Sequence, residues 1–410
     1  MPEKERVLSG GLIDGKLVIA EGRHGVYGVD LSSGRQAWQL PRVDGPVAMP
    51  AVAVVGSHHV LLFTQGTKAT DSRLVAYDHL DTAQPTLLWQ VQLDDVTSSG
   101  VAVDGPTAFL GDRSGNVYAV KVSTAPVTGL RPTADAFAWK PFTGPGTVDA
   151  PPAVADGKVF AVLRDSTTGD VTVLALEEDT GKPAWPQPFS PSAPPTYGSA
   201  PTVDGGRVFV GFADQTIRAL RERDGVSLWS DRLNSPFFPL SAPAAAGGNV
   251  FALATFPGAE AGLYRLDAAT GQRDWWFEFD SSTVVSSPVV VGPYLYVALD
   301  DGRVAALQQA PDVEVWERGT GRGGLRPVAV GGGILVVSKA GSRGGLLGFA
   351  HDPSGHLVHV VSPTRLNLGR SLLNYVEAFA VVVIAALFLR FGAGRLRRRR
   401  TAPAASEEPA

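Results

Sequence analysis

The sequence of 410 residues contains no cysteine. This absence excludes disulfide bridges, thiolate metal sites and cysteine nucleophiles together. Charged residues are also scarce, at 19%, whereas the chain has 47 glycines and 31 prolines. Such a balance is typical of many short strands joined by tight turns, and it disfavours long helices.

Net positive charge is lacking over most of the chain. The formal net charge is −4, but eight arginines lie between Arg365 and Arg400. Residues 1–364 therefore carry 28 basic and 37 acidic side chains, a net charge of −9. Because phosphate backbones are bound by clustered Lys and Arg side chains, we exclude nucleic acid as a partner.

A short pattern of residues recurs along the chain. In its clearest copy Asp267 is followed by a polar turn, then by Gly271 and Trp275. Four copies with one spacing indicate a repeat protein. The other three copies are Asp30, Gly34 and Trp38, then Glu177, Gly181 and Trp185, and finally Arg221, Gly225 and Trp229.

Each repeat predicts four short strands. A unit begins with two apolar strands around a tight glycine turn, such as Asp14-Gly15 or Asp104-Gly105, and eight such hairpins follow one another. A third strand and a fourth strand that bears a tryptophan complete the unit. Seven tryptophans, 41 to 51 residues apart, mark the fourth strands: Trp38, Trp89, Trp139, Trp185, Trp229, Trp275 and Trp316.

Four strands in roughly 40 to 50 residues are the signature of a propeller blade. We therefore predict an all-β fold over residues 7–363, an eight-bladed β-propeller of four-stranded blades. The last unit, residues 326–363, has no tryptophan. Seven blades with an irregular closing piece are therefore the alternative.

Strand geometry explains the fixed distance from glycine to tryptophan. Glycine suits a turn position with positive φ, and the acidic side chain before it can accept hydrogen bonds from the turn amides. Four residues later a strand returns its side chain to the same face. We interpret these residues as scaffold, with each indole filling the space between two blades, and an aromatic ligand platform is the alternative. The interpretation covers Asp30, Gly34, Trp38, Trp89, Trp139, Gly181, Trp185, Gly225, Trp229, Asp267, Gly271, Trp275 and Trp316.

The repeat, written x-P-x-V-x-x-G-x-V-[FY]-V and then A-x-D-x-x-T-G-x-x-x-W, resembles that of the pyrroloquinoline-quinone (PQQ)-type propellers. The resemblance covers roughly residues 7–362. That superfamily includes quinoprotein alcohol dehydrogenases and the non-catalytic BamB-like propellers. The resemblance implies the fold, but it does not choose a function, because the repeat is scaffold in both branches.

The quinoprotein enzymes of this superfamily use a vicinal cysteine pair and a calcium ion, and the first is absent here. We interpret the acidic pairs Asp94-Asp95 and Asp300-Asp301 as solvated turn residues, with calcium ligation as the alternative. The adjacent His58 and His59 would point to opposite faces of a regular strand, as would His356 and His359. We therefore expect a non-enzymatic protein without a catalytic residue, metal site or cofactor, and we assign no cofactor-binding residue.

The C-terminal region predicts a membrane anchor. After a linker at residues 364–370, residues 371–389 are predominantly apolar and span about 28 Å as a helix, close to the thickness of a bilayer core. We predict a transmembrane helix over residues 371–391 and a basic cytoplasmic tail over residues 392–410. The arginines expected to hold the cytoplasmic end are Arg390, Arg395, Arg397, Arg398, Arg399 and Arg400.

Two polar residues lie on one face of this predicted helix. Asn374 and Glu377 are three residues apart within its first two turns. They are candidates for contact with another membrane helix. The alternative is that both lie at the level of the lipid headgroups, beside Tyr375.

The predicted topology contains a conflict. The basic tail indicates a single-pass cell-membrane protein with an extracytoplasmic propeller, but residues 1–6 have no apolar signal region. We expect a signal or first helix upstream of this sequence. A tail-anchored protein with a cytoplasmic propeller is the alternative.

The leading hypothesis for function is a membrane-anchored protein-interaction scaffold for other membrane or envelope proteins, active in envelope assembly or beside a transporter. A propeller that senses a ligand or cofactor is the alternative, followed by a divergent quinoprotein dehydrogenase. We expect function to lie where the repeats diverge, in the long insertions at residues 122–137 and 255–261.

Overall fold

The computed structural model divides the chain into two units, Met1–Pro363 and Thr364–Ala410. All the residues that the structure describes belong to the first unit. They are residues 12–22, 25–41, 50–97, 99–191, 197–233, 241–255, 261–279, 286–299, 301–309, 314–320, 325–331, 333–339, 345–350, 355 and 357–361.

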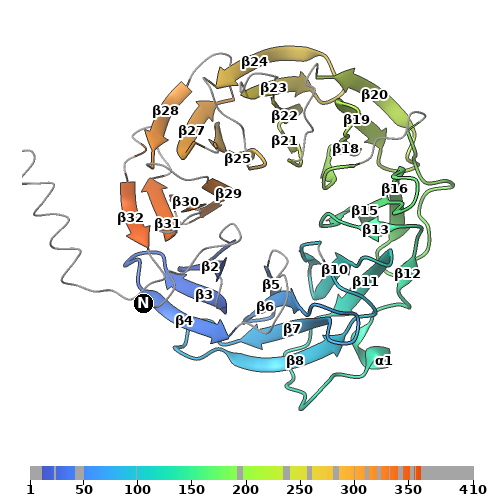
Figure 1. Ribbon diagram of the computed structural model, residues 1–410, viewed down its shortest axis with the longest axis vertical. Coiled ribbons are helices and arrows are strands. Elements are labelled where there is room, and N and C mark those ends of the chain that lie inside the picture. The colour runs from blue at the N-terminus through green and yellow to red at the C-terminus, as the bar shows by residue number, and fades with distance from the viewer. Residues whose placement is uncertain are drawn as a thin grey trace, which may run out of the picture. The chain divides into compact units, whose positions relative to one another are not determined.

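Eight antiparallel four-stranded sheets follow one another around a common axis (Figure 1). Blade 1 contains β1 (Leu12–Asp14), β2 (Leu17–Gly22), β3 (Gly25–Asp30) and β4 (Gln36–Pro41). Blade 2 contains β5 (Ala51–Val55), β6 (His58–Gln65), β7 (Arg73–Asp78) and β8 (Thr86–Gln92). Blade 3 contains β9 (Ala102–Asp104), β10 (Thr107–Gly111), β11 (Asn116–Lys121) and β12 (Phe142–Thr143), with helix α1 (Thr133–Ala136) before β12. Blade 4 contains β13 (Thr147–Val148), β14 (Ala153–Ala155), β15 (Lys158–Arg164) and β16 (Val171–Glu177).

The second half of the ring repeats this plan. Blade 5 contains β17 (Thr202–Asp204), β18 (Arg207–Gly211), β19 (Thr216–Arg221) and β20 (Ser227–Arg232). Blade 6 contains β21 (Ala244–Ala246), β22 (Asn249–Thr255), β23 (Ala261–Asp267) and β24 (Arg273–Phe279). Blade 7 contains β25 (Val289–Val291), β26 (Tyr294–Ala298), β27 (Arg303–Gln308) and β28 (Glu314–Gly319). Blade 8 contains β29 (Leu325–Gly331), β30 (Ile334–Lys339), β31 (Gly345–Ala350) and β32 (Leu357–Val361).

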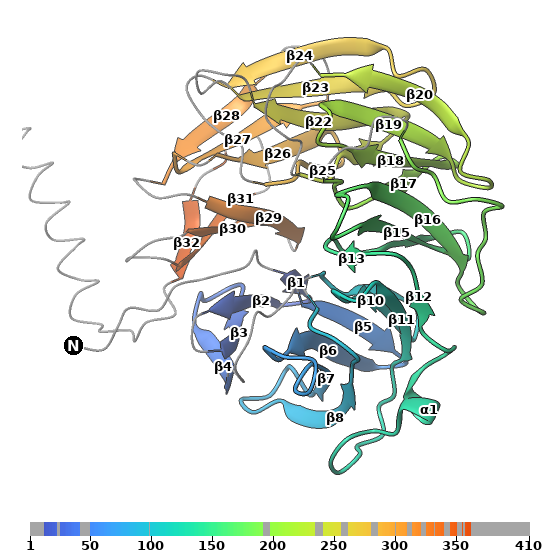
Figure 2. The same ribbon diagram turned by 45° about the vertical axis from the view of Figure 1, so that its right-hand side comes forward.

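The predicted all-β propeller of eight four-stranded blades is confirmed, and the seven-bladed alternative is wrong. Every sheet is built from consecutive strands, and the last unit forms a complete blade without a tryptophan. In most blades the first strand lies nearest the axis and the fourth lies outermost, as β4, β8, β20, β24 and β28 show in Figure 2. Blade 4 differs because β13 and β14 both pair with β15.

Hydrophobic side chains gather between the blades. Eight buried clusters fill the eight contacts between neighbouring blades, which we call seams. Seven seams contain a tryptophan. In seam order from 1–2 to 7–8 these are Trp38, Trp89, Trp139, Trp185, Trp229, Trp275 and Trp316.

Each tryptophan reaches across its seam to the next blade. There the indoles other than that of Trp275 meet the turn that joins the third and fourth strands. The indole N–H of Trp275 is buried without a hydrogen-bond partner among the described residues. The indole N–H of Trp185 donates to the Glu222 carbonyl at 2.7 Å, and that of Trp229 donates to the Ala268 carbonyl at 3.0 Å. We call this contact the indole clasp. Three further clasps join Trp38 to Leu80, Trp89 to Ser123, and Trp139 to Glu178.

The glycine of the repeat makes room for the clasp. Gly225 has a φ of +74°, and a Cβ there would lie 2.6 Å from the ring of Trp185 in the preceding blade. Gly271 and Trp229 repeat this arrangement. The glycine therefore faces the tryptophan of the preceding blade. Its positive φ shapes the turn, and its missing side chain admits the indole.

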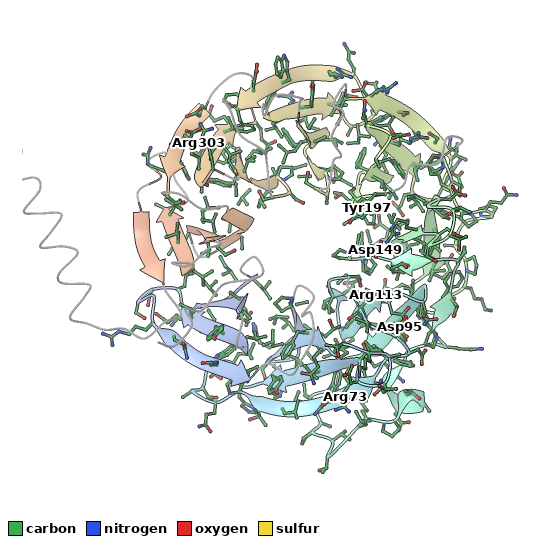
Figure 3. The ribbon with its side chains drawn as sticks, in the orientation of Figure 1. Arg73, Asp95, Arg113, Asp149, Tyr197 and Arg303 are labelled. Carbon is green, nitrogen blue, oxygen red and sulfur yellow. The ribbon has the colours of Figure 1, made fainter. Side chains whose placement is uncertain are left out.

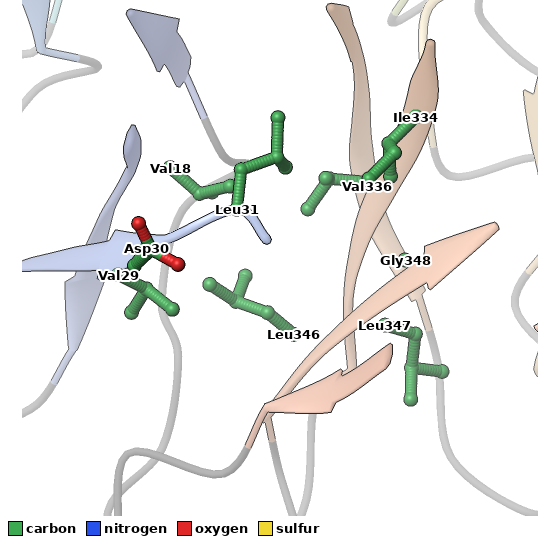
Figure 4. Close-up of a pocket in the computed structure, with 9 residues that line it drawn as sticks. All are labelled: Val18, Val29, Asp30, Leu31, Ile334, Val336, Leu346, Leu347 and Gly348. Atoms are coloured by element: carbon green, nitrogen blue, oxygen red, sulfur yellow. The ribbon is translucent and has the colours of Figure 1, made fainter. Parts of the chain in front are cut away.

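The seam between blades 8 and 1 has no indole. Its cluster contains Tyr27 and smaller aliphatic side chains. A cavity lies in this seam, and among the described residues that line it Asp30 alone is charged (Figure 4). Its lining residues come from both blades: Val18, Val29, Asp30, Leu31, Ile334, Val336, Leu346, Leu347 and Gly348.

Strand register explains this difference. Trp38 pairs with Gly28 in blade 1, and His359 pairs with Gly348 at the equivalent point of blade 8. A Cβ on Gly28 would lie 2.1 Å from the Trp38 ring, so the glycine opposite makes space for the indole. Blade 8 keeps this glycine, but histidine stands at the tryptophan position.

Within the described residues, no helix has the length and apolar character needed to cross a membrane. The predicted linker 364–370, transmembrane helix 371–391 and basic tail 392–410 lie outside those residues. The same is true of Asn374 and Glu377, and of the arginines from Arg390 to Arg400.

A pair of glycine substitutions tests the packing of the indole clasp. We expect Gly225→Ala to lower the free energy of unfolding by about 2–4 kcal/mol, because it adds backbone strain and a clash with Trp185. Gly206→Ala is the matched control, since Gly206 has a φ of +73° and a Cβ added there would meet no atom within 4 Å. It should cost about 1 kcal/mol from strain alone. Equal losses in urea titrations of the two variants would contradict the clasp.

The seam between blades 8 and 1 gives a second prediction. We expect His359→Trp to raise the melting temperature by about 2–4 °C, because an indole opposite Gly348 would fill the cavity and reach the Leu31 turn. His359→Phe, which adds a ring without an N–H donor, should gain less. The explanation of this seam is wrong if His359→Trp melts at or below the temperature of the parent protein in calorimetry.

Candidate interaction surface

The recurring acidic residues hold the turns that the indoles contact. The Asp30 carboxylate accepts hydrogen bonds from the Ser32 hydroxyl and from both the amide and the hydroxyl of Ser33. These bonds hold the pKa of Asp30 down to about 2. Asp267 accepts equivalent bonds from Ala269 and Thr270, which likewise lower its pKa. Both carboxylates are therefore used to fix a backbone turn.

The two histidines that are adjacent in sequence bind different carboxylates. His58 Nδ1 lies 2.6 Å from Asp78 within blade 2, whereas His59 Nδ1 lies 2.7 Å from Asp14 of blade 1. His59 thus links two blades. His356 and the side chain of His359 lie outside the described residues.

The two members of each acidic pair that is adjacent in sequence also do not act together. The Asp95 carboxylate accepts bonds from the Val96 amide and the Ser114 hydroxyl, while Asp94 lies 3.2 Å from the Tyr118 hydroxyl. Asp301 pairs with Arg303, and Asp300 lies outside the described residues. Across the described part of the chain, no three His, Asp or Glu side chains come together as a metal site.

A polar surface runs along one face of blades 3 to 5, where the turns between second and third strands lie beside the segments that lead into each blade. Figure 3 labels four of its residues, Asp95 among them, and the other three, Arg113, Asp149 and Tyr197, follow one another along the inner side of the ring. We call this the turn face. It is completed by Asp95, Arg164, Asp214 and Arg218.

A buried carboxylate positions Arg113. Asp112 is fully buried and accepts hydrogen bonds from the amides of Ser114 and Asn116. Its second oxygen accepts from the Asn116 amide group and from the Tyr118 hydroxyl, at 2.6 Å. Burial and this carboxylate raise the pKa of Tyr118. The rigid turn exposes Arg113, and no described residue bonds to its guanidinium.

Blades 4 and 5 add ion pairs to the turn face. The Arg164 guanidinium donates to the Asp149 carboxylate at 2.5 and 2.8 Å. Tyr197 lies near this pair, and burial raises its pKa. Arg218 donates to Asp214 at 2.6 Å. The turn face therefore presents fixed charges of both signs, which suits a polar protein interface.

Apart from Asp95, for which calcium ligation was the alternative interpretation, none of the turn-face residues was expected from the sequence as part of a site. Asp112, Asp214 and Asp301 all lie in turns between a second and a third strand, and each accepts a hydrogen bond from a backbone amide two to four residues later. The recurrence of these aspartates is visible in the sequence, but the repeat that contains glycine and tryptophan is a longer pattern and gives a stronger signal. Nothing local in the sequence shows that Arg113, Asp149 and Tyr197 share a face.

The long insertion at residues 122–137, where we expected function, lies along the outer strand of blade 2. The Val127 amide donates to the Leu88 carbonyl, and the Arg131 amide donates to the Gln90 carbonyl. The contacts give this insertion a structural role at β8. Of the second insertion, residues 256–260 lie outside the described residues.

Solved structures of differently named proteins share this fold. The designed Ika8 protein aligns with a TM-score of 0.65 at 14% identity, over 83% of this chain and 96% of that chain. Sqt1 of Saccharomyces cerevisiae gives 0.62 at 13%, over 83% and 94%. Quinohemoprotein alcohol dehydrogenase ADHIIG from Pseudomonas putida HK5 gives 0.59 at 14%, over 83% and 71%. These likenesses show the fold alone.

Curated relatives are similar in sequence. The outer membrane protein assembly factor BamB of Yersinia pestis is 26% identical over 290 residues, which are 68% of this chain and 66% of that protein. BamB of Escherichia coli K12 is 26% identical over 307 residues, 73% of this chain and 72% of that protein. The chain thus spans about two thirds of the length of the Yersinia relative.

The resemblance drawn from the repeat is confirmed by a family model. The model is described as outer membrane protein assembly factor BamB, and it matches residues 123–255 and 238–361. The two matches run together over more than half of the chain. This chain therefore belongs to the BamB family of propellers with PQQ-type repeats.

Proposed function

We propose that this propeller is a non-catalytic scaffold that binds other membrane or envelope proteins during assembly of the cell envelope. The family and the names of the curated relatives support this role. The turn face supplies a surface of fixed shape with charges of both signs. A scaffold needs a rigid structure and a surface complementary to its partner. The indole clasps and the turn held by the buried Asp112 supply the rigidity.

The exposed Arg113 carries the proposal. Most polar side chains of the turn face already have partners within the propeller, such as the pairs Asp149–Arg164 and Asp214–Arg218. Arg113 instead presents its guanidinium on a turn whose backbone is held by Asp112 and by Val96. A guanidinium on a rigid support loses little freedom on binding, and arginine is enriched among residues that dominate interfaces.

The scaffold acts from the membrane. In our proposal residues 371–391 span the cell membrane, the arginines that follow hold the cytoplasmic end, and the propeller is extracytoplasmic. Asn374 and Glu377 then contact a neighbouring membrane helix. The length and apolar character of residues 371–389 support this arrangement.

Arg113→Glu tests the scaffold. The variant should recover at least about tenfold less of its partner proteins than the parent chain after cross-linking in native membranes, because a central interface arginine is worth over about 1.4 kcal/mol. Its melting temperature should not change, since the Arg113 guanidinium bonds to no described residue.

Arg223→Glu is the matched control. The Arg223 side chain is 76% exposed. It lies in the turn between the third and fourth strands of blade 5, β19 and β20, which is at the opposite end of the strands from turns between second and third strands such as that of Arg113. This variant should recover partners as the parent chain does. Equal recovery by both variants, or no reproducible partner with the parent chain, would contradict the proposal.

A further inference from the structure

The outer strand of blade 2 binds an extended segment of its own chain. Leu130 forms a parallel bridge with Gln90 of β8. The amides of Val127 and Arg131 donate to the carbonyls of Leu88 and Gln90, both at 2.7 Å. The segment therefore lies along the outer edge of β8 and pairs with it at one parallel bridge.

An arginine fixes this segment. The Arg131 guanidinium lies 5.2 Å from the centre of the Trp89 ring, and Trp89 is fully buried. Arg131 also donates to the carbonyls of Lys121 and Asp135. Leu130, the residue before it, packs beside polar Gln90 and stays 46% exposed. A leucine–arginine pair is thus the recognition element on β8, and its arginine covers the repeat tryptophan.

The outer strand of blade 6 offers the same backbone positions. Trp275 pairs with Arg265 as Trp89 pairs with Ala76, and a bulge follows both pairs. Asp274 and Trp276 therefore hold the places of Leu88 and Gln90. Among the described residues, β24 pairs with β23 alone, so no described segment covers its outer edge.

Blade 6 departs from the other blades at the residue after the repeat tryptophan. Trp276 stands there and is 50% exposed. An exposed indole on an uncovered strand edge is unusual, because such edges favour pairing with other chains. In the other tryptophan blades the residue is polar or small: Gln39, Gln90, Lys140, Pro186, Ser230 and Glu317.

Acidic side chains flank Trp276 on β24. Asp274 and Glu278, two residues before and after it, are exposed, and the Asp274 carboxylate lies 3.2 Å from the Arg265 guanidinium. The nearby Arg273 is neutralised, because it donates to both oxygens of the Asp231 carboxylate in blade 5. Trp275 is only partly buried, whereas Trp89 under Arg131 is fully buried. The exposed part of the Trp275 ring is therefore available to an arginine of a ligand, as the Trp89 ring is to Arg131.

We propose that the outer edge of β24 binds an extended segment of a partner protein that carries an apolar residue followed by arginine. The segment adds as a parallel strand through the carbonyls of Asp274 and Trp276. Its apolar side chain packs on Trp276, and its arginine covers Trp275 as Arg131 covers Trp89. This site is separate from the turn face, and it takes a chain segment by strand addition.

A peptide with the sequence of residues 124–133, Thr-Ala-Pro-Val-Thr-Gly-Leu-Arg-Pro-Thr, is the probe. Labelled peptide should bind the full-length protein saturably in fluorescence anisotropy. Trp276→Gln, which installs the residue that blades 1 and 2 carry there, should weaken binding at least about fivefold, the loss expected for an indole contact of about 1 kcal/mol. A peptide with glutamate in place of its arginine should weaken binding as much or more.

Leu228→Ala is the control on the neighbouring outer strand β20, where Leu228 is 38% exposed. It should leave peptide affinity unchanged.

The proposal fails if the parent protein shows no saturable binding of the peptide. It also fails if Trp276→Gln binds the peptide as tightly as the parent does, because the peptide would then have displaced the segment on β8. It also fails if sedimentation shows a dimer that Trp276→Gln dissociates, because a second copy would then occupy the edge. None of these outcomes bears on the Arg113 test.

Discussion

The hydrogen bond from a tryptophan indole to a carbonyl of the next blade organises this propeller. Five such bonds of 2.7–3.0 Å are described, from Trp38, Trp89, Trp139, Trp185 and Trp229. Each is worth about 1 kcal/mol. Its larger effect is geometric: it sets each indole against a turn of the following blade, and for Trp139, Trp185 and Trp229 that turn carries a glycine in contact with the ring. Neighbouring blades are thereby locked at one spacing, and the surfaces of several blades can act together as one interface.

The fold could be predicted because its repeat is local. Spacing from Gly271 to Trp275, and the hairpins at turns such as Asp14-Gly15, are each set within a few residues. Which tryptophan meets which glycine could not be predicted, because Gly225 contacts Trp185 forty residues earlier. The turn face was missed for the same reason: Arg113, Asp149 and Tyr197 come to one face only when blades 3, 4 and 5 pack side by side. Trp276 was visible as a departure from the repeat, but its exposure depends on which outer strands are covered.

Two kinds of surface follow from the same ring. At the turn face, capped turns such as that of Asp112 hold charges in fixed places, which suits a folded partner. At the outer edge, strands keep unpaired carbonyls, which suits an extended partner. Blade 2 covers its edge with residues 127–131, whereas no described segment covers that of blade 6. A scaffold of an envelope assembly would use both surfaces, the turn face for a folded neighbour and the outer strand edge for an extended chain segment.

The seam between blades 8 and 1 gives the sharpest test of the indole clasp, because it alone joins two blades without a tryptophan. Hydrogen exchange of the native protein reports the free energy of local opening for each strand. We predict that amides of β2, β3, β30 and β31 exchange first among the central strands, before those of blades 3 to 5. Uniform exchange around the ring, or earlier opening at a seam that holds an indole clasp, would contradict the central role of the clasp.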